Sequence, residues 1–346
     1  MRTSRVVSRF AGAFSVLALC AAAPLAAGSR SAGDLLSLVP ADAASVAVVR
    51  LADLRESPLA GRLFSGADHM TSDGDGARFL EEAQLDPKKD VDTVVIAARP
   101  SSGQHDSPVL ALFEGRFDPV RLAAAAENRG AVRTSTPAGD YFLLPDKHGN
   151  DEGHRGAAAF VSSSLVIAGT ESAVIQALAD RRSGGTGFAS GASLGRQLKR
   201  VDRDSSVWAL VDVTRYPAVA RRSARVHASG EADGEPAMAI MGAMKSVTLL
   251  AVQAKARGDA LELSATGLAS DAETRQLLED SLRGVLAMWR LAVQDKSPDL
   301  VPMLRKFTVS SDSESVSIHG TLSGAFLRSV AEKARHKKTE TESRTE

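Results

Sequence analysis

The chain has 346 residues, a length typical of about two domains. Lysine plus arginine number 42, as do aspartate plus glutamate, so the formal net charge is zero. This balance excludes a strongly basic nucleic-acid-binding protein and a strongly acidic solvating chain. With 44% hydrophobic residues the chain can bury a large core, and its single cysteine excludes a disulfide framework and a cysteine-rich metal site.

The first 28 residues have the three regions of a secretory signal peptide. Residues 1–9 carry three arginines and no acid, residues 10–22 are apolar apart from one glycine and one serine, and small residues at 26–28 precede a cut before Ser29. We therefore expect an exported protein, periplasmic or extracellular, and the abundance of alanine, arginine and glycine favours a bacterial source.

Two other fates of this segment stay open. Cys20 is a candidate lipidation site, although Leu19 stands where lipoprotein signals carry a small residue. Residues 10–28 are also just long enough to remain as an uncleaved membrane anchor, although Pro24 interrupts them. No later segment approaches the 18 unbroken apolar residues of a membrane span, so we expect no membrane contact beyond the signal segment.

The first half of the mature chain, residues 29–182, alternates strand and helix patterns. In chain order we expect a strand at 45–51, helical material at 58–85 interrupted by the polar stretch 71–76, and strands at 92–98 and 109–114. A helix from Asp118-Pro119 to Gly130 follows, then strands at 141–144 and 157–168, and then a helix that runs from its cap Thr170 to Arg182. Residues 183–192 are rich in glycine and serine and read as a linker.

The second half, residues 193–334, repeats this order. We expect a strand at 206–213, helical material to 245, strands at 246–256 and 260–268, a helix behind the capping box Ser270–Glu273, a helical piece ending near Phe307, a hairpin at 308–322 and a last helix from Ser323. The helix behind the capping box is expected to bury Leu278, Leu282, Val285 and Trp289. Residues 335–346 read as a charged flexible tail.

Local matches between the halves indicate an internal duplication. Residues 53–62 match 212–221, where in both a strand ends, a proline starts a helix and an arginine follows one turn on. Residues 167–172 match 318–323 around a Gly-Thr strand-to-helix turn. The fold class we predict is therefore α+β, with two similar β-α-β-β-α-β-β-α halves whose sheets are mostly antiparallel and pack on helices.

Several segments resemble exported bacterial proteins of the domain-of-unknown-function type, which are uncharacterised. The resemblance is carried by residues 38–43, 54–58, 85–92 and 160–170, all of them turn and core signatures. It implies export and an α+β repeat, and it brings no catalytic residues to this chain.

One serine stands in a sequence typical of a hydrolase. Residues 191–195 match the Gly-X-Ser-X-Gly nucleophile elbow, with Ser193 as the nucleophile. That elbow requires a strand immediately before it, whereas a Gly/Ser-rich linker precedes Ser193. We therefore expect Ser193 to cap a helix that contains Leu194 and Leu198, with a periplasmic serine hydrolase as the alternative function.

Two histidines form the best candidate metal site. His148 and His154 lie among Asp146, Asp151 and Glu152, and imidazole with carboxylate suits zinc. The glycines between them favour a solvated hairpin loop, so a metal-binding module is a second alternative.

The remaining motifs point to structure. The acidic residues of 73–76 depart from a calcium-loop pattern and favour a polar loop. Trp208 and Trp289 are expected in the core, His319 on an exposed strand face, and the methionines of 238–244 on a buried helix stripe.

No constellation of nucleophile, base and orienting group has the required local context. We predict no catalytic, cofactor-binding or metal-ligating residue and no cofactor. The leading hypothesis is an exported bacterial envelope protein, a non-enzymatic binding or assembly module whose partner is another envelope protein and not a nucleic acid.

Overall fold

A computed structural model describes residues 35–55, 57, 74–100, 108–145, 155–185, 187–188, 193–216, 247–296 and 301–326. Its contacts divide the chain into two compact units, Met1–Val211 and Asp212–Glu346. The signal segment 1–28, with Cys20, and the tail 335–346 lie outside the described residues. So does half of the predicted linker 183–192, namely residues 186 and 189–192.

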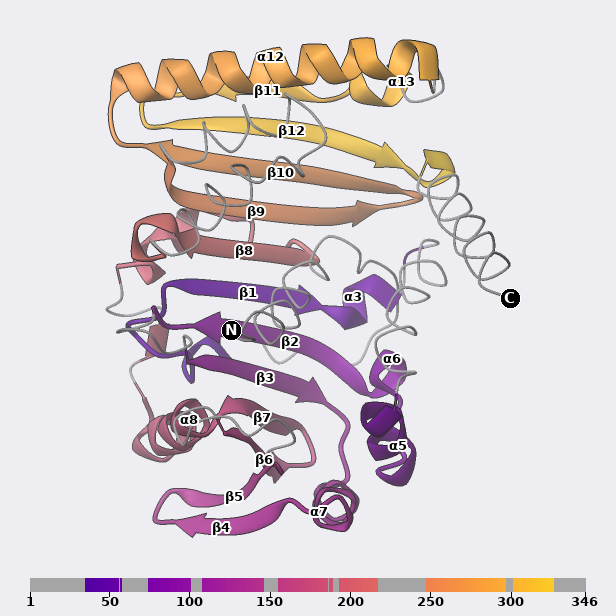
Figure 1. Cartoon of the computed structure of the whole chain (residues 1–346), viewed down its shortest axis with the longest axis vertical. Helices are drawn as coiled ribbons and strands as arrows, with labels where there is room; N and C mark the ends of the chain where they lie inside the picture. Colours follow the sequence, from indigo (N-terminus) through magenta and orange to yellow (C-terminus); the bar gives the residue numbers. More distant parts are fainter. Residues whose placement is uncertain are drawn as a thin grey trace, which may run out of the picture. The chain divides into compact units, whose positions relative to one another are not determined.

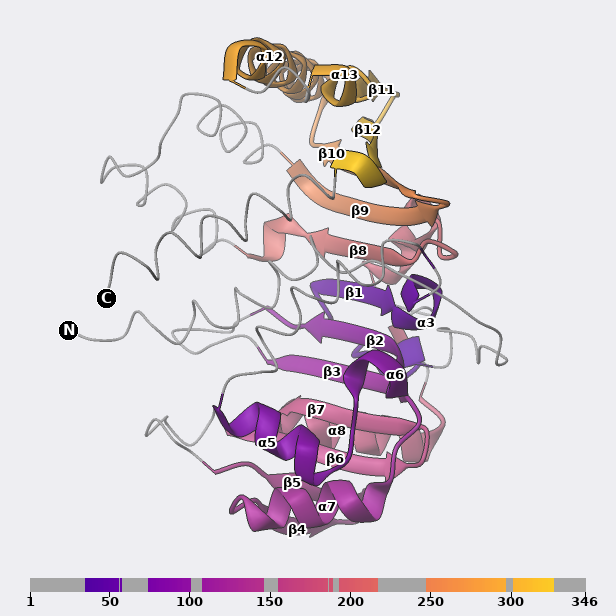
Figure 2. The same cartoon turned by 90° about the vertical axis from the view of Figure 1, so that its right-hand side faces the viewer.

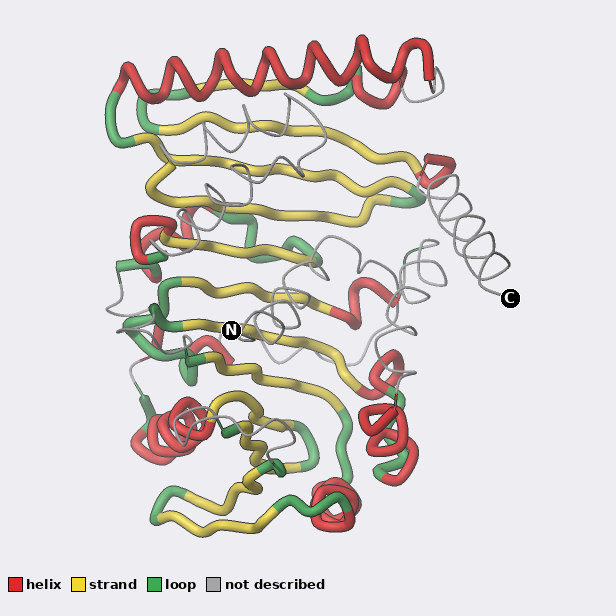
Figure 3. Tube along the Cα trace, in the orientation of Figure 1, coloured by secondary structure: helices red, strands yellow, loops and turns green. Residues whose placement is uncertain are grey.

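The first unit is built on an antiparallel sheet (Figures 1 and 3). Among the described residues, its strands follow the spatial order β8 (Val207–Asp212), β1 (Ser45–Arg50), β2 (Val91–Ala98), β3 (Val109–Gly115), β7 (Leu165–Thr170), β6 (Gly156–Ser162), β5 (Gly139–Leu143) and β4 (Val132–Thr136). Every adjacent pair is antiparallel. Alternation of buried and half-buried residues along β2 places one of its faces in the core.

The helices of this unit include α3 (Leu51–Arg55), α5 (Gly74–Glu82), α6 (Pro87–Asp90), α7 (Pro119–Asn128), α8 (Glu171–Ser183) and the 3₁₀ helix η1 (Gly195–Arg200). Two of them, α6 and α7, begin at an aspartate whose side chain caps the first turn. The predicted start of α7 is confirmed, because Asp118 accepts hydrogen bonds of 3.1 Å from the backbone N–H groups of Val120 and Arg121. Thr170 does occupy the N-cap of α8, but its buried hydroxyl makes no hydrogen bond.

Helices α5 and α7 lie next to one another (Figure 2) and close one part of the core. Phe117, Leu122 and Ala125 are buried there together with Ala83 and Val91. Their burial explains the helical spacing of apolar residues in α7, since one stripe of that helix faces the sheet.

Three expectations for the first unit were wrong in detail. The segment 157–168 forms two strands, β6 and β7, because the turn at Ser163-Ser164 interrupts an otherwise apolar run. The strand β4 was missed, since its polar sequence VRTST lacks a hydrophobic face. Helix α5 begins inside the stretch 71–76 that we expected to be a polar loop.

The second unit consists of a four-stranded antiparallel sheet, as far as the described residues show, and the long helix α12 (Ala272–Lys296) (Figure 1). Its strands follow the order β9 (Val247–Arg257), β10 (Ala260–Ala269), β12 (Ser315–Ser323) and β11 (Thr308–Ser311). The predicted strands and hairpins at 246–268 and 308–322 are confirmed. Short helices η2 (Val213–Arg215) and α13 (Val301–Leu304) complete the described part of the unit.

The chain is therefore of the α+β class, with antiparallel sheet and packed helices. Trp208 is 1% exposed, which confirms its predicted core position. None of the helices in the described ranges combines the length and apolar character needed to cross a membrane.

Candidate binding surface on helix α12

Helix α12 begins at a fully satisfied acidic cap. The Asp271 carboxylate accepts hydrogen bonds from the Thr274 backbone N–H at 2.8 Å, the Thr274 hydroxyl at 2.8 Å and the Ser270 hydroxyl at 2.6 Å. The predicted capping box placed this role on Ser270 and Glu273, so the observed cap lies one residue later. Asp271 was missed because Ser270 and Asp271 are both good N-cap residues and the sequence alone leaves the register of the first turn open.

These hydrogen bonds lower the pKa of Asp271 from 3.8 to about 2, with the Ser270 hydroxyl as the largest cause. Because the folded pKa is depressed, the stabilising contribution of the cap is fully present above pH 3.8 and is lost as the pH falls through about 2. We expect Asp271→Ala to lower the melting temperature at pH 7. The difference in melting temperature between this variant and the wild type should shrink as the pH falls from 4 to 2. Thermal unfolding followed by circular dichroism checks this.

Asp271→Asn is the matched control, because asparagine caps helices about as well as aspartate. It is expected to retain the melting temperature at pH 7. Equal losses from Asp271→Ala and Asp271→Asn would contradict the capping role.

The inner face of α12 packs on the sheet of its own unit. Leu278 is 4% exposed and forms a cluster with Val247 on β9 and Val316 on β12. Farther along the helix, the Arg290 guanidinium donates hydrogen bonds to the backbone carbonyls of Leu304 at 3.1 Å and Phe307 at 2.8 Å. These contacts hold both halves of the helix, so its outward face is fixed in orientation.

Four large apolar side chains of α12 are exposed, and three of them lie in its C-terminal half. Leu277, Met288, Trp289 and Leu291 are 62%, 38%, 48% and 67% exposed, and they make up half of the eight exposed large hydrophobic residues in the described parts of the chain. The expectation that Trp289 is a core residue is wrong. It belongs to the same apolar series of the helix as Leu278, but Leu278 is buried whereas Trp289, near the C-terminal end of the helix, is half exposed. We call Leu277, Gly284, Met288 and Leu291 the α12 outer face, because they lie on one side of the helix.

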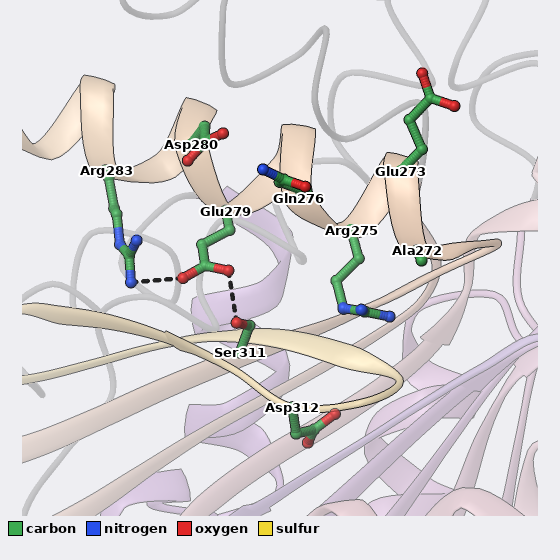
Figure 4. Close-up of a pocket in the computed structure, with 9 residues that line it drawn as sticks. All are labelled: Ala272, Glu273, Arg275, Gln276, Glu279, Asp280, Arg283, Ser311 and Asp312. Atoms are coloured by element: carbon green, nitrogen blue, oxygen red, sulfur yellow. Dashed lines mark hydrogen bonds and ion pairs between the residues drawn. The ribbon is translucent and has the colours of Figure 1, made fainter.

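A polar groove of about 430 Å³ borders the N-terminal half of the helix (Figure 4). Glu279 reaches toward β11, where its carboxylate accepts a 2.5 Å hydrogen bond from the Ser311 hydroxyl and forms a 2.5 Å ion pair with Arg283 (Figure 4). Arg275 donates a 2.7 Å hydrogen bond to the Ser313 carbonyl. These contacts are made within the unit, so the groove fastens α12 to the β11–β12 hairpin.

The side chains at this surface are charged and polar along the groove and apolar on the α12 outer face. The described ranges contain no group of histidine, cysteine and acidic side chains placed to hold a metal. Of the seven histidines of the chain only His319 is described, and it is exposed on β12 as predicted. The groove therefore supplies ion pairs and hydrogen bonds, and the α12 outer face supplies apolar contact area.

The sequence-predicted site residues are not brought together here. Ser193 is exposed in a turn before η1, whose N-cap position is Leu194 with no side-chain hydrogen bond, so the expected capping role of Ser193 is wrong. His148 and His154 lie outside the described residues, as do the methionines of 238–244. The serine-hydrolase and metal-binding alternatives stay predictions.

A second charged cluster, in the first unit, has a structural explanation. Asp92 on β2 forms ion pairs with Arg55 at 2.5 Å and Arg116 at 2.9 Å. Both guanidinium groups also donate hydrogen bonds to backbone carbonyls at or just after α6. Arg55 binds the carbonyls of Lys88 and Val91, and Arg116 binds that of Lys89. Arginines commonly bind the last carbonyls of a helix in this way, so the cluster closes α6.

No model of a known protein family matches the chain, and no curated protein sequence matches it. Solved structures that resemble it include three crystal forms of TP0453. Form III aligns with a TM-score of 0.49 at 10% identity and covers 86% of this chain and 97% of that chain. Form I gives 0.43 at 11% identity over 85% and 95%, and form IV gives 0.42 at 9% over 86% and 96%. Values this low transfer no site residue, so the surface on α12 rests on its own geometry.

Sequence reasoning missed the α12 outer face, although a signal was present. Leu277, Gly284 and Leu291 are spaced by seven residues and therefore lie on one side of a helix. The same segment carries a second apolar series through Leu278 and Val285. Two apolar stripes on one helix indicate that one faces the core and the other faces outward.

Proposed function

We propose that the protein is an exported, non-enzymatic binding or assembly module of the bacterial envelope, which holds another envelope protein on the α12 outer face. The supporting observation is the concentration of exposed apolar side chains on this one helix. Exposed apolar residues scattered singly need no explanation, whereas several on one side of one helix favour an interaction site. The export itself is supported by the signal-peptide pattern of residues 1–28.

The chemistry of the surface favours an apolar α-helical segment as the partner. The exposed leucines run along the helix axis on both sides of Gly284, where a built Cβ atom meets nothing within 4 Å. A glycine there leaves a shallow step in the stripe that a partner side chain can occupy, as in ridge-and-groove packing of helices. The neighbouring Arg283 is already paired with Glu279, so no strongly charged partner is required.

We further propose that the chain arose by duplication of one α+β module. Support comes from the order of strands within each unit: β2-β3-β7-β6 in the first and β9-β10-β12-β11 in the second. In both series the first two strands form a hairpin that is followed by a helix, and the strand that comes last in the chain, β7 or β12, pairs antiparallel with the second strand of that hairpin. The first series differs in having β4 and β5 between the helix and β6. An experimental structure in which the Cα atoms of these two series superimpose would support the proposal, and a different connectivity would overturn it.

The binding proposal is tested by site-specific photocrosslinking in cells. A photoreactive amino acid at position 288 or 291 is expected to give a discrete crosslinked product, because both side chains project from the α12 outer face. The double substitution Leu277→Gln with Leu291→Gln should abolish the product at position 288 while the melting temperature stays within a few degrees, since both leucines are exposed.

Position 120 on α7 is the matched control, because Val120 is 77% exposed on another helix. A product at position 120 equal to that at position 288 would contradict the proposal. Fluorophosphonate labelling that depends on Ser193, or a zinc-dependent rise in melting temperature that depends on His148 and His154, would support the alternative functions instead.

A further inference from the structure

Among the described residues, strand β4 is the last strand of the sheet of the first unit. Within the described residues it pairs only with β5, through the register Val132↔Leu143 to Thr136↔Gly139. Alternate backbone N–H and C=O groups of such a strand point away from its neighbour and can pair with another extended chain. Val132 is 62% exposed, and Arg133 and Ser135 are exposed as well.

Strand β4 has few of the devices that keep edge strands from pairing. Its sequence VRTST has no proline and no lysine, and three of its five residues are β-branched. Its one charge, on Arg133, is neutralised by Asp140 on β5, with hydrogen bonds of 3.0 Å and 2.5 Å to one carboxylate oxygen. That hydrogen bonding also lowers the pKa of Asp140, so the pair stays ionised at neutral pH.

We propose that β4 pairs antiparallel with β4 of a second copy of this chain, with Thr134 of one copy facing Thr134 of the other. This inference is independent of the α12 outer face. The two sheets then become continuous across a two-fold axis that passes beside Thr134.

The strand is self-complementary in this register. Val132 faces Thr136 of the partner subunit, and Arg133 faces Ser135 of the partner subunit, so no like charges stand directly opposite each other. Threonine and valine pairs are favourable cross-strand neighbours. A foreign peptide would satisfy the backbone groups equally well, but only a second copy brings this matched set of side chains.

The test uses charge exchange at position 134, with the full chain and size-exclusion chromatography coupled to light scattering. The wild type is expected at twice the mass of one chain at a concentration of about 100 µM, which detects even weak association. Thr134→Lys and Thr134→Glu should each run as a single chain, because like charges then face each other at the axis. An equimolar mixture of the two variants should return to twice the mass.

Several results would overturn the inference. A monomeric wild type at that concentration shows that no second copy binds. A dimer that persists in both variants, or a mixture that stays monomeric, shows that position 134 does not face itself. The double substitution Leu277→Gln with Leu291→Gln should leave the dimer intact, and its loss there would place the second copy on α12. Equal circular dichroism melting curves of the two variants and the wild type establish that both variants are folded.

Discussion

Replacing Gly169 by alanine is expected to destabilise the first unit by about 3 kcal/mol, which is near the upper end for a single substitution. Gly169 has a φ of +152°, a conformation that side-chain-bearing residues rarely adopt. A Cβ atom at this position would lie 2.1 Å from the carbonyl oxygen of Val109 and 3.1 Å from the Cα atom of Leu110. Both atoms belong to the backbone of β3, which is held by hydrogen bonds on each side and cannot yield as a side chain would.

Urea unfolding at pH 7 measures this effect, and Gly130→Ala is the matched control. Gly130 also has a positive φ, +81°, but a Cβ atom there meets nothing within 4 Å. Its substitution is expected to cost only the conformational strain, about 1 kcal/mol. An equal loss of unfolding free energy in the two variants would show that the close approach of β7 to β3 does not add to the destabilisation.

The sequence marked Gly169 for another reason, as part of a repeated strand-to-helix turn. Its counterpart Gly320 has no positive φ, and a Cβ atom there would lie 2.3 Å from the ring of Phe307. Both glycines are therefore required by close packing, one against backbone and one against a ring. A repeat can identify such positions, but the atoms that crowd them come from distant parts of the chain.

Local signals predicted most strands and one helix cap. Apolar β-branched runs located β1, β2 and β3, and Asp118 before Pro119 located α7, because both signals act within a few residues. Strand β4 carries no such signal. It is a strand because β5 lies beside it, and an edge strand with polar side chains leaves little trace in hydrophobic periodicity.

The candidate binding surface shows the same limit more sharply. Leu277 and Leu278 are adjacent and chemically identical, yet the first is 62% exposed and the second 4%. Periodicity separates the two apolar stripes of α12, but it does not show which stripe faces the sheet. That depends on Val247, from a strand before the helix in the sequence, and on Val316, from a strand after it. Trp289 was misplaced for this reason, since it continues the buried series beyond the part that the sheet covers.

These adjacent leucines give the second large expected effect. Leu278→Ala should destabilise the second unit by about 3 kcal/mol, because it removes a buried side chain and leaves a cavity beside Val247 and Val316. Leu277→Ala should change the free energy of unfolding by less than about 0.5 kcal/mol, because its side chain is mostly exposed. Urea unfolding of the two variants, followed by far-ultraviolet circular dichroism, measures the difference.

Crosslinking at position 288 separates stability from binding in the same pair of variants. Leu277→Ala should weaken the crosslinked product although the fold is unchanged, since Leu277 belongs to the α12 outer face. Leu278→Ala should reduce the product only in proportion to the fraction of α12 that has detached from the sheet, and lowering the temperature should restore it. A full product with Leu277→Ala, or a loss with Leu278→Ala that persists where the helix is folded, would mean that the partner does not contact the outer stripe of this helix.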